Sequence, residues 1–526
     1  MSDPRLREAG DSALLLQLAP VIDAAVNARA IAIATAVRNR DLTGVRDVVS
    51  TFRSVAVYFD PLRSDVDEIS GALREAINTA PMRADSRRHH IPVAYGADDG
   101  PDLDEVATRA GLTSSEVITR HAGIDYRVFM LGFQPGFAYL GLVDPSIASP
   151  RRASPRLHVP AGSVGIAGRQ TGVYPSSTPG GWQIVGRALE PVFDSTKTPP
   201  ARFAPGDTVT FRRASADATP RLGEVVPPGR PAGRHCATVL RPGLFTTIQD
   251  SGVWGEQGLG VPVSGAMDVF SHAAANLSVG NAPDAPSLEA TIAGPELRFD
   301  EPATIALAGA DLSATVDNVT VPLQRPMVCA AGSVLRFESR RRGARTYIAI
   351  AGGVELARRF PVRPLAAAEA IAIAEPNATT VRRRAVRIAP LPSGGARLRV
   401  LPGPQQDELP DGCLEILCGN RFTVSPQSNR VGYRLTGAVV PSGGGDMISD
   451  ATFHGAVQVP PSGEPILLMA DRQTTGGYPQ VAVVITADLP IAGQLAPGDW
   501  IEFELCSRED ARRALVAREG MLSGAA

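Results

Sequence analysis

The chain has 526 residues, of which 44% are hydrophobic and only 5% aromatic, and it is rich in glycine (52) and proline (45). This length and composition predict several globular domains with loop-rich, mainly β structure, and they exclude an intrinsically disordered chain. A formal net charge of −2 gives no reason to expect nucleic acid or a membrane surface as a partner. No stretch approaches ~20 uninterrupted apolar residues, and the start MSDPRLREAGDS lacks the apolar core of a signal peptide.

The cysteines and the single lysine further limit the cellular compartment and the kinds of cofactor site that we expect. The five cysteines are odd in number and scattered, which favours a reduced, cytoplasmic protein over a disulfide framework. Lys197 is the single lysine among 52 basic residues, and it lies in DSTKTPPA, which is not a phosphate-binding glycine loop. We therefore expect neither a Walker A nucleotide site nor a covalently bound biotin.

Residues 1–88 are typical of a small α+β domain. Residues 20–40 carry Ala, Val and Ile at three- and four-residue spacing without internal Gly or Pro, which predicts a helix. Residues 47–60 change to the alternation of a strand, and residues 65–80 predict a second helix that begins with an acidic turn. This order of elements favours a ferredoxin-like unit.

The rest of the chain is predicted to be β structure in two halves. After two short helices, strands punctuated by Gly and Pro indicate barrels or sandwiches. The stretch ASADATPRLGEVVPPGRPAG has the composition of a linker. The predicted units are a barrel at 89–213, a linker at 214–236, a first barrel of the second half at 237–395, a second barrel at 396–508, and a tail helix with a disordered end at 509–526.

An internal repeat relates the two halves. Residues 158–175 read HVPAGSVGIAGRQTGVYP and residues 458–479 read QVPPSGEPILLMADRQTTGGYP. Each is followed by a similar closing strand, FAPGDTVTF or LAPGDWIEF. Such repetition predicts two barrels built on one plan, each presenting a polar Gln-Thr-Gly-Tyr loop.

Longer motifs carry a resemblance to a known family. LGFQPGFAYLGL (131–142) and PRRASPRLHVPAGSVGIAGRQTGVYPSSTPGGWQIVG (150–186) look like the B-type subunit of 5-oxoprolinase, of the Kip inhibitor or allophanate hydrolase subunit 1 family. GLFTTIQDSGVWGEQGLGVPVSGAMD (243–268) and HGAVQVPPSGEPILLMADRQTTGGYPQVAVVITADLP (454–490) resemble its partner, the C-type subunit or allophanate hydrolase subunit 2. The resemblance covers nearly the whole chain. It implies a fused B–C pair with a cyclophilin-like β-barrel in the first half and two related β-barrels in the second.

The resemblance also implies the function. The preferred interpretation is the B/C component of an ATP-dependent 5-oxoprolinase, a hydrolase that opens the lactam of 5-oxoproline to glutamate with a separate A-type subunit. ATP and Mg²⁺ would then be transient co-substrates. The alternatives are the carboxyltransferase component of a biotin-dependent, urea-type carboxylase supplied by other chains, and a non-catalytic regulator of a histidine kinase. The expected partners are the A-type protein, a small-molecule substrate and a possible second copy of the chain.

One stretch departs from the family pattern. After AGG, the sequence AGGVELARRFPVRPLAAAEAIAIAE lacks the Gly-Ser-Arg-Ser-Thr segment that is usual in the C-type relatives, and Asn429 stands where an aspartate is usual. If these loops belong to the active site, the C-type half has altered activity.

Four residues are predicted to be catalytic. His158 and His454 each lie just before a predicted barrel strand, where a histidine can act as a general acid or base, with a packing role as the alternative. Asp471 belongs to the same repeat as His454, and Asp250 could bind the Mg²⁺ of a nucleotide. No HExxH, CxxC or Cys/His cluster occurs, so no structural metal is expected.

The predicted binding residues provide hydrogen-bond donors beside glycines, which allow close approach of a ligand, or arginines that can hold a carboxylate or phosphate. For each isolated Gln-Thr-Gly run, a tight turn is the alternative. The predicted substrate- and nucleotide-binding set is Arg152, Arg156, Ser163, Gln170, Thr171, Gly172, Tyr174, Gly180, Gly181, Trp182, Gln249, Gln257, Asp268, Arg430, Gln458, Gln473, Thr474, Thr475, Gly476, Gly477 and Tyr478.

Overall fold

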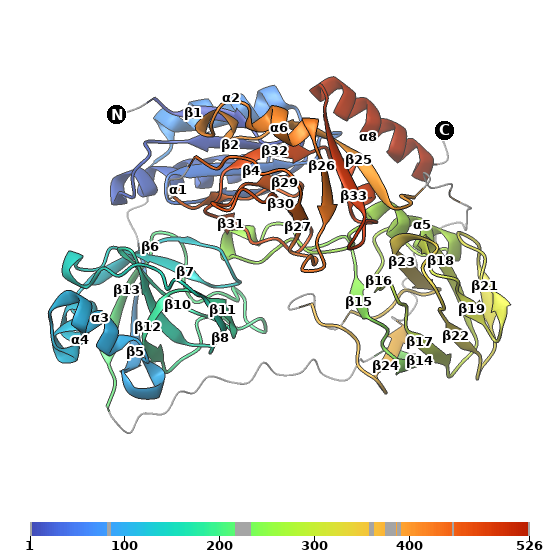
Figure 1. The fold of residues 1–526 in the computed structure, drawn as a ribbon, viewed down its shortest axis with the longest axis horizontal. Coiled ribbons are helices and arrows are strands. Elements are labelled where there is room, and N and C mark those ends of the chain that lie inside the picture. The colour runs from blue at the N-terminus through green and yellow to red at the C-terminus, as the bar shows by residue number, and fades with distance from the viewer. Residues whose placement is uncertain are drawn as a thin grey trace.

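The computed structural model describes residues 3–81, 86–215, 233–356, 362–373, 386, 391–443 and 447–523. It confirms a mainly β chain with an α+β N-terminal domain and two related, closed barrels (Figure 1). Most of the predicted linker, residues 216–232, and the predicted end, residues 524–526, lie outside the described residues. The same holds for residues 357–361 in the stretch that departs from the family pattern.

The α+β domain consists of one antiparallel sheet and two helices. Its elements are β1 (Arg5–Glu8), β2 (Ala13–Gln17), α1 (Ala24–Arg38), β3 (Val45–Ser50), β4 (Ser54–Phe59) and α2 (Val66–Thr79). The sheet order is β1-β2-β4-β3, so the chain order is ββαββα and not the βαββαβ of a ferredoxin-like unit. The N-terminal strand β1 lies beside β2, where the last strand of a ferredoxin-like unit would lie. Asp23 and Asp65 cap the two helices through their carboxylates.

Both faces of this sheet are covered. Every residue of β2 and of β4 is buried. Leu14 and Val57 face a core shared with α1 and α2, whereas Leu15 and Tyr58 face a core shared with the second barrel. Strands that are buried on both faces are apolar at successive positions, which accounts for the runs ALLL and VAV. The domain therefore packs on the C-terminal barrel, as Figure 1 shows.

The first barrel begins at Arg88. Its strands are β5 (Arg88–Tyr95), β6 (Asp125–Leu131), β7 (Ala138–Gly141), β9 (Ser163–Ala167), β10 (Gln170–Val173), β12 (Gln183–Ala188) and β13 (Thr208–Arg213), in the closed order β10-β7-β6-β13-β5-β12-β9. Its helices are η1 (Ala97–Asp99), α3 (Leu103–Ala110), α4 (Ser114–Ala122) and η2 (Pro145–Ile147). A separate two-stranded ribbon, β8 (Arg156–Val159) with β11 (Thr178–Gly180), is called here the first ribbon.

The second barrel has the same parts. Its strands are β25 (Gly395–Pro402), β26 (Arg421–Val424), β27 (Gly432–Thr436), β29 (Ala456–Gln458), β30 (Ile466–Leu468), β32 (Gln480–Val484) and β33 (Trp500–Leu505), in the closed order β25-β32-β29-β30-β27-β26-β33. Its helices are η4 (Gln406–Glu408), α6 (Cys413–Gly419), α7 (Leu489–Ala492) and the tail helix α8 (Arg508–Ser523). The second ribbon is β28 (Asp450–Ala451) with β31 (Thr475–Gly476).

The two barrels share one topology. In each, the first strand pairs in parallel with the last, β5 with β13 and β25 with β33, and the other strands follow round the barrel in the same chain order. The closing turns also agree, because the carboxylates of Asp207 and Asp499 accept from the backbone N–H of Ala204 (3.0 Å) and Ala496 (2.9 Å). The internal repeat is confirmed.

The register of the repeat differs from the prediction. Gln170 to Val173 form barrel strand β10, whose counterpart is β30, so the first barrel presents no Gln-Thr-Gly loop. The counterpart of β31, in Gln473–Tyr478, is β11, in which Gly180 pairs with Arg156 as Gly476 pairs with Asp450. The structural equivalent of Thr-Thr-Gly-Gly-Tyr is therefore the Thr-Pro-Gly-Gly-Trp run that ends at Trp182.

In the sequence between the two barrels, the chain forms two stacked sheets instead of the barrel predicted at 237–395. One contains β14 (Arg234–Arg241), β17 (Glu296–Phe299), β19 (Thr315–Val316), β20 (Val319–Thr320), β22 (Val334–Arg336) and β24 (Ala370–Ile373). The other contains β15 (Phe245–Gln249), β16 (Ser287–Thr291), β18 (Ala303–Asp311), β21 (Met327–Cys329) and β23 (Arg342–Ile350). Phe299 and Ile348 come from different sheets and share one core, so this unit is a sandwich. Helices η3 (Gln257–Leu259) and α5 (Val269–Val279) also belong to it.

Two further findings concern the described residues as a whole. All five cysteines are free thiols. No helix in the described part of the chain has the length and apolarity needed to cross a membrane.

Candidate functional site

The segment 250–268, called here the junction loop, lies where all four units meet. Gly136 of the first barrel donates its N–H to the carbonyl of Leu259 (2.8 Å). The carboxylate of Asp47, from the α+β domain, accepts from the N–H of Gln257 (3.0 Å). Ser264 donates its N–H to Ala470 of the second barrel (3.1 Å). Hydrogen bonds from each of the neighbouring units therefore hold this loop in its conformation.

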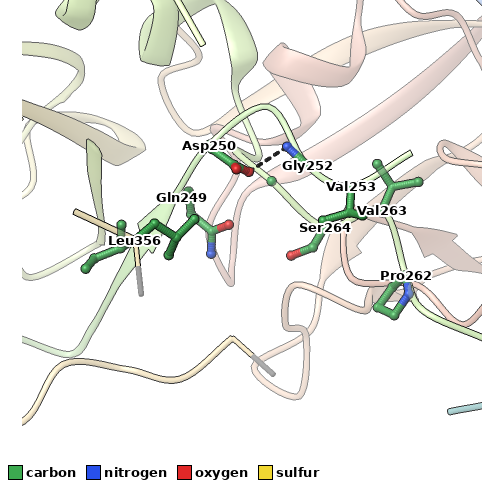
Figure 2. Close-up of a pocket in the computed structure, with 10 residues that line it drawn as sticks. Gln249, Asp250, Gly252, Val253, Pro262, Val263, Ser264 and Leu356 are labelled. Carbon is green, nitrogen blue, oxygen red and sulfur yellow. Dashed lines mark hydrogen bonds between the residues drawn. The ribbon is translucent and has the colours of Figure 1, made fainter. Parts of the chain in front are cut away.

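A pocket lies where strand β15 runs into the junction loop (Figure 2). Gln249, Asp250 and Ser264 contribute an amide, a carboxylate and a hydroxyl to its lining, and Leu356 lines it from the sandwich. Asp250 also accepts from the N–H of Gly252 (2.8 Å), which fixes the turn. The structure thus brings the predicted residues Gln249 and Asp250 into one small cavity.

A buried ion cluster supports this pocket. The Ser264 hydroxyl donates to Asp471 (2.6 Å), and Asp471 pairs with the guanidinium of Arg430 at 2.8 and 2.9 Å. Arg430 also pairs with Glu289, which is fully buried. Burial alone would lower the pKa of Arg430, but the carboxylates of Asp471 and Glu289 outweigh it and hold the pKa above its usual value. Arg430 is therefore a permanent cation that fixes two carboxylates.

The cluster continues into helix α5. Glu289 accepts from the Tyr347 hydroxyl (2.7 Å), whose oxygen accepts from the N–H of Asp268 (2.7 Å). Asp268 caps α5 through Ser271 N–H (2.9 Å) and also accepts from Gln494 (2.8 Å). Burial raises the pKa of Asp268. The structure places this predicted ligand-binding residue in a helix cap inside the protein.

His454 lies just before strand β29 of the second barrel, near Arg472 and Arg430. Burial, and then the charges of Arg472 and Arg430, lower the pKa of His454 to about 3, so its imidazole is neutral near pH 7. Arg472 donates to the Oε1 of the predicted residue Gln257 (3.0 Å). The predicted partner of His454, Asp471, instead bonds to Arg430 and Ser264. Nε2 of His454 and Oγ1 of Thr474 are buried without a protein partner, so a water or ligand would satisfy both.

The predicted Thr-Thr-Gly-Gly loop is only partly accessible. Thr474 and Thr475 are buried, whereas Gln473 and Tyr478 are exposed. Gln458 donates to the carbonyl of Tyr478 (3.4 Å). A Cβ atom on Gly476 would lie 2.9 Å from the amide nitrogen at the end of the Gln458 side chain, and Gly477, which follows, is partly exposed.

In the first barrel, the predicted arginines bind an internal carboxylate. Asp102 is buried and accepts from Arg156 at 2.7 and 2.6 Å, from Arg152 at 3.0 Å and from the N–H of Ile184 at 2.7 Å. His158 is exposed on strand β8. These residues form a cluster separate from the pocket at Asp250.

The other predicted residues of the first barrel lie in its strands, in the first ribbon or directly beside them, and most are buried. Thr171 hydrogen-bonds to Nε2 of His121 (2.9 Å), whose Nδ1 bonds to Tyr95 (2.8 Å), and burial lowers the pKa of His121 to about 3. Tyr174 packs edge-on against Trp182 at 6.4 Å. The remaining members lie in strands β9 to β12 or directly beside them, and they are Ser163, Gln170, Gly172, Gly180 and Gly181.

Sequence reasoning missed several residues of the site. Arg472 lies between the predicted residues Asp471 and Gln473, and Ser264 lies four residues before the predicted Asp268, so proximity in the sequence was an available signal. Asp47 and Asp102 lie far from any motif and gave none. Among the described residues, no group of three or more His, Cys, Asp or Glu side chains is arranged to hold a metal ion.

Two family models match the chain. The model described as carboxyltransferase domain, subdomain C and D, matches residues 4–203. The model described as carboxyltransferase domain, subdomain A and B, matches residues 259–505. The second match therefore begins inside the junction loop, and Gln249 and Asp250 of the pocket lie just before it.

Curated relatives match the two halves separately. The B-type subunit of 5-oxoprolinase from Escherichia coli O157:H7 is 40% identical over 203 residues, 38% of this chain and 92% of the relative. The C-type subunit of 5-oxoprolinase from Escherichia coli (strain K12) is 33% identical over 294 residues, 52% of this chain and 93% of the relative. Urea amidolyase of Saccharomyces cerevisiae is 29% identical over 313 residues, which are 52% of this chain but only 17% of that protein.

Solved structures match this chain over nearly its whole length or over about half of it. The crystal structure of TTHA0988 has a TM-score of 0.80 at 35% identity and covers 95% of this chain and 100% of its own. The Kluyveromyces lactis urea carboxylase has a TM-score of 0.51 at 26% identity, over 57% of this chain and 30% of its own. The chain therefore belongs to the carboxyltransferase-domain family that includes the B-type and C-type subunits of 5-oxoprolinase, and it joins the two kinds in one polypeptide.

Proposed function

We propose that this chain is the B/C component of an ATP-dependent 5-oxoprolinase that opens 5-oxoproline to glutamate with a separate A-type subunit. The observation that carries the proposal is that one chain contains nearly full-length relatives of both named subunits. The five free thiols agree with a cytoplasmic location for this activity.

The chemistry requires activation of a stable amide. Transfer of the terminal phosphoryl group of ATP to the lactam oxygen makes the ring carbon electrophilic. Water then adds to that carbon, and the ring C–N bond breaks to leave a free amine and a γ-glutamyl phosphate. A second water hydrolyses this acyl phosphate to glutamate and phosphate. In this proposal the lactam binds at the pocket of the junction loop, where Gln249, Asp250 and Ser264 are the polar lining residues. Arg430 holds Asp471 and Glu289 in place behind them.

A second candidate function is carboxyl transfer within a urea-type carboxylase whose biotin is carried by another chain. The carboxyltransferase family models and the similarity to urea amidolyase favour it. This alternative predicts no ADP formation when the chain is mixed with an A-type protein.

The deciding experiment is an assay of ADP and glutamate with Mg²⁺, ATP and 5-oxoproline, with and without the A-type subunit. We expect both products only when both proteins are present. Asp250→Asn should lower kcat/KM at least tenfold, whereas Asp284→Asn, on the exposed turn after α5, should not. Absence of ADP in every combination would refute the proposal and leave carboxyl transfer or regulatory binding.

A further inference from the structure

The two ribbons occupy equivalent places on equivalent barrels, but their surroundings differ. The second ribbon is buried, since Asp450 is 1% exposed and Ala451 and Thr475 are 0% exposed. In the first ribbon, Leu157 is 90% exposed, and His158 and Pro179 are exposed beside it. One copy of a repeated surface is therefore covered within the chain and the other is not.

The covered copy shows how such a ribbon is bound. The sheet of the α+β domain donates to Asp450 from Gln17 (3.3 Å), Thr51 (3.4 Å) and Ser54. The Tyr58 hydroxyl donates to the carbonyl of Thr452 (2.9 Å), the residue after the ribbon strand. The ribbon is thus recognised by a protein surface that supplies donors to a carboxylate.

In the first ribbon, which is not covered, different side chains occupy the positions equivalent to those of the second ribbon. Gly180 pairs with Arg156 in the first ribbon, as Gly476 pairs with Asp450 in the second, so Arg156 stands in the place of Asp450. Leu157 follows Arg156 in the chain as Ala451 follows Asp450, and the register of the first ribbon shifts at this point, between Gly180 and Thr178. A buried acid with a small neighbour is therefore replaced by a cation with a large apolar neighbour.

The charge around Leu157 is positive. Arg152 and Arg156 share the buried carboxylate of Asp102, Arg152 also lies 3.7 Å from Glu105, and Arg151 beside them is exposed. A matching surface would need acceptors in place of the donors that the α+β domain supplies to Asp450. It would also need an apolar socket for the Leu157 side chain, because an isolated, fully exposed leucine gains stability only when it is buried.

We propose that the first ribbon is the docking surface for a separate protein chain with an apolar socket for Leu157 bordered by carboxylates. Within the proposed function, on which this identification rests, that chain is the A-type subunit. It covers the first ribbon as the α+β domain covers the second.

The test is the affinity of the purified full chain for the purified A-type subunit, measured with calorimetry together with turnover. We expect Leu157→Asp to weaken binding at least tenfold, since the charge would enter an apolar socket near carboxylates. Val328→Asp is the matched control, because Val328 is 75% exposed on strand β21 of the sandwich and should bind like the parent chain. Unchanged thermal unfolding of both variants excludes misfolding as the cause.

Binding and turnover separate the two proposals. Equal affinity of Leu157→Asp and the parent chain, or failure of the parent to bind the A-type protein, would overturn the docking surface. So would a dimer of the parent chain alone that Leu157→Asp converts to a monomer, since the occupant would then be a second copy. Binding that depends on Leu157 without any turnover would support the docking surface and refute the oxoprolinase activity.

Discussion

At the scale of single residues, Glu289 is the buried carboxylate on which the folded structure around the pocket depends most, because two arginines lie beside it. Its carboxylate is 0% exposed, pairs with Arg430, and lies 3.7 Å from the guanidinium of Arg345. Removing one member of a buried ionic cluster leaves the others desolvated and unpaired. The pocket above this cluster therefore depends on a residue that no ligand needs to touch.

Glu289→Gln should lower the free energy of unfolding by about 3–5 kcal/mol, as is typical when a buried pair is broken. Urea denaturation followed by tryptophan fluorescence measures it. Glu301→Gln is the control, because Glu301 pairs with Arg234 where both side chains are largely exposed, and it should cost less than about 1 kcal/mol. A loss below about 1 kcal/mol for Glu289→Gln would contradict the cluster's role.

Stability should also depend on pH through His272, which is buried and bonded to Ser287 at 2.9 Å. Burial lowers its pKa to about 4, whereas the unfolded chain has a histidine pKa near 6.5. The folded state therefore binds fewer protons between these values, and stability falls as the pH drops from about 6.5 towards 4.

Between pH 6.5 and 5, His272→Gln should lose about 1 to 2 kcal/mol less stability than the parent chain. Parallel urea titrations at the two pH values measure the difference. His158→Gln, on the exposed first ribbon, serves as the control. Identical pH dependence of His272→Gln and the parent would show that folding does not change the pKa of His272.

The candidate site was predictable from the sequence where its residues are neighbours in one motif. Gln249 ends strand β15, Asp250 directly follows it, and both line the pocket. Glu289 and Arg430 are 141 residues apart, and neither periodicity nor composition encodes their contact. For the same reason, Asp102 beneath Arg152 and Arg156 was not predictable, and those arginines were interpreted as ligand-binding.

At the scale of elements, the closing turn of each barrel is the clearest recurring feature. Gly206 and Gly498 have φ of +93° and +88°, which permits the Pro-Gly-Asp turn before β13 and β33. An L-residue with a side chain strains this left-handed conformation even where space is available.

Gly498→Ala should therefore destabilise the second barrel by about 1–2 kcal/mol, although nothing lies within 4 Å of the added Cβ. Gly71→Ala is the matched variant, since it also meets open space but lies inside helix α2. It should stabilise the chain by about 0.5–1 kcal/mol. Chemical denaturation of both variants would reveal these opposite signs, and equal effects would refute the backbone explanation.

The repeat was predictable, but its register was not. Two short polar runs, at Gln170 and at Gln473, are alike in letters, yet one is a barrel strand and the other leads into a ribbon. Pairing between strands decides the register, and pairing is absent from a single sequence. The sandwich was likewise predicted as a barrel because short strands between turns are common to both architectures.

At the scale of the whole molecule, the α+β domain is the piece that joins the two halves. Its sheet contacts the second barrel through Leu15, Ala56 and Tyr58, which share a core with Ala451 and Phe453. The apolar runs of β2 and β4 show that both faces are buried, but the sequence does not say which partner covers the second face.

The two halves should therefore stay together without a covalent connection. We expect a full chain cut by a protease at a site inserted within residues 216–232 to elute from gel filtration at the volume of the uncut chain. Apolar contacts are not screened by salt, so the volume should be unchanged in 1 M NaCl, where the Debye length is about 3 Å. Two separate peaks at micromolar concentration would contradict the packing at Leu15 and Tyr58.

Contact between Gln17 and Asp450 spans 433 residues of sequence. At a synthesis rate of about 5–20 residues per second, the ribosome needs roughly 20 to 90 s to make the chain between them. Throughout that interval, the face of β2 and β4 that carries Leu15 and Tyr58 lacks the second barrel, although Tyr58 also contacts Trp254 of the junction loop. A nascent chain of this kind exposes an apolar sheet for most of its synthesis, which makes its yield in the cell sensitive to translation rate and to chaperone supply.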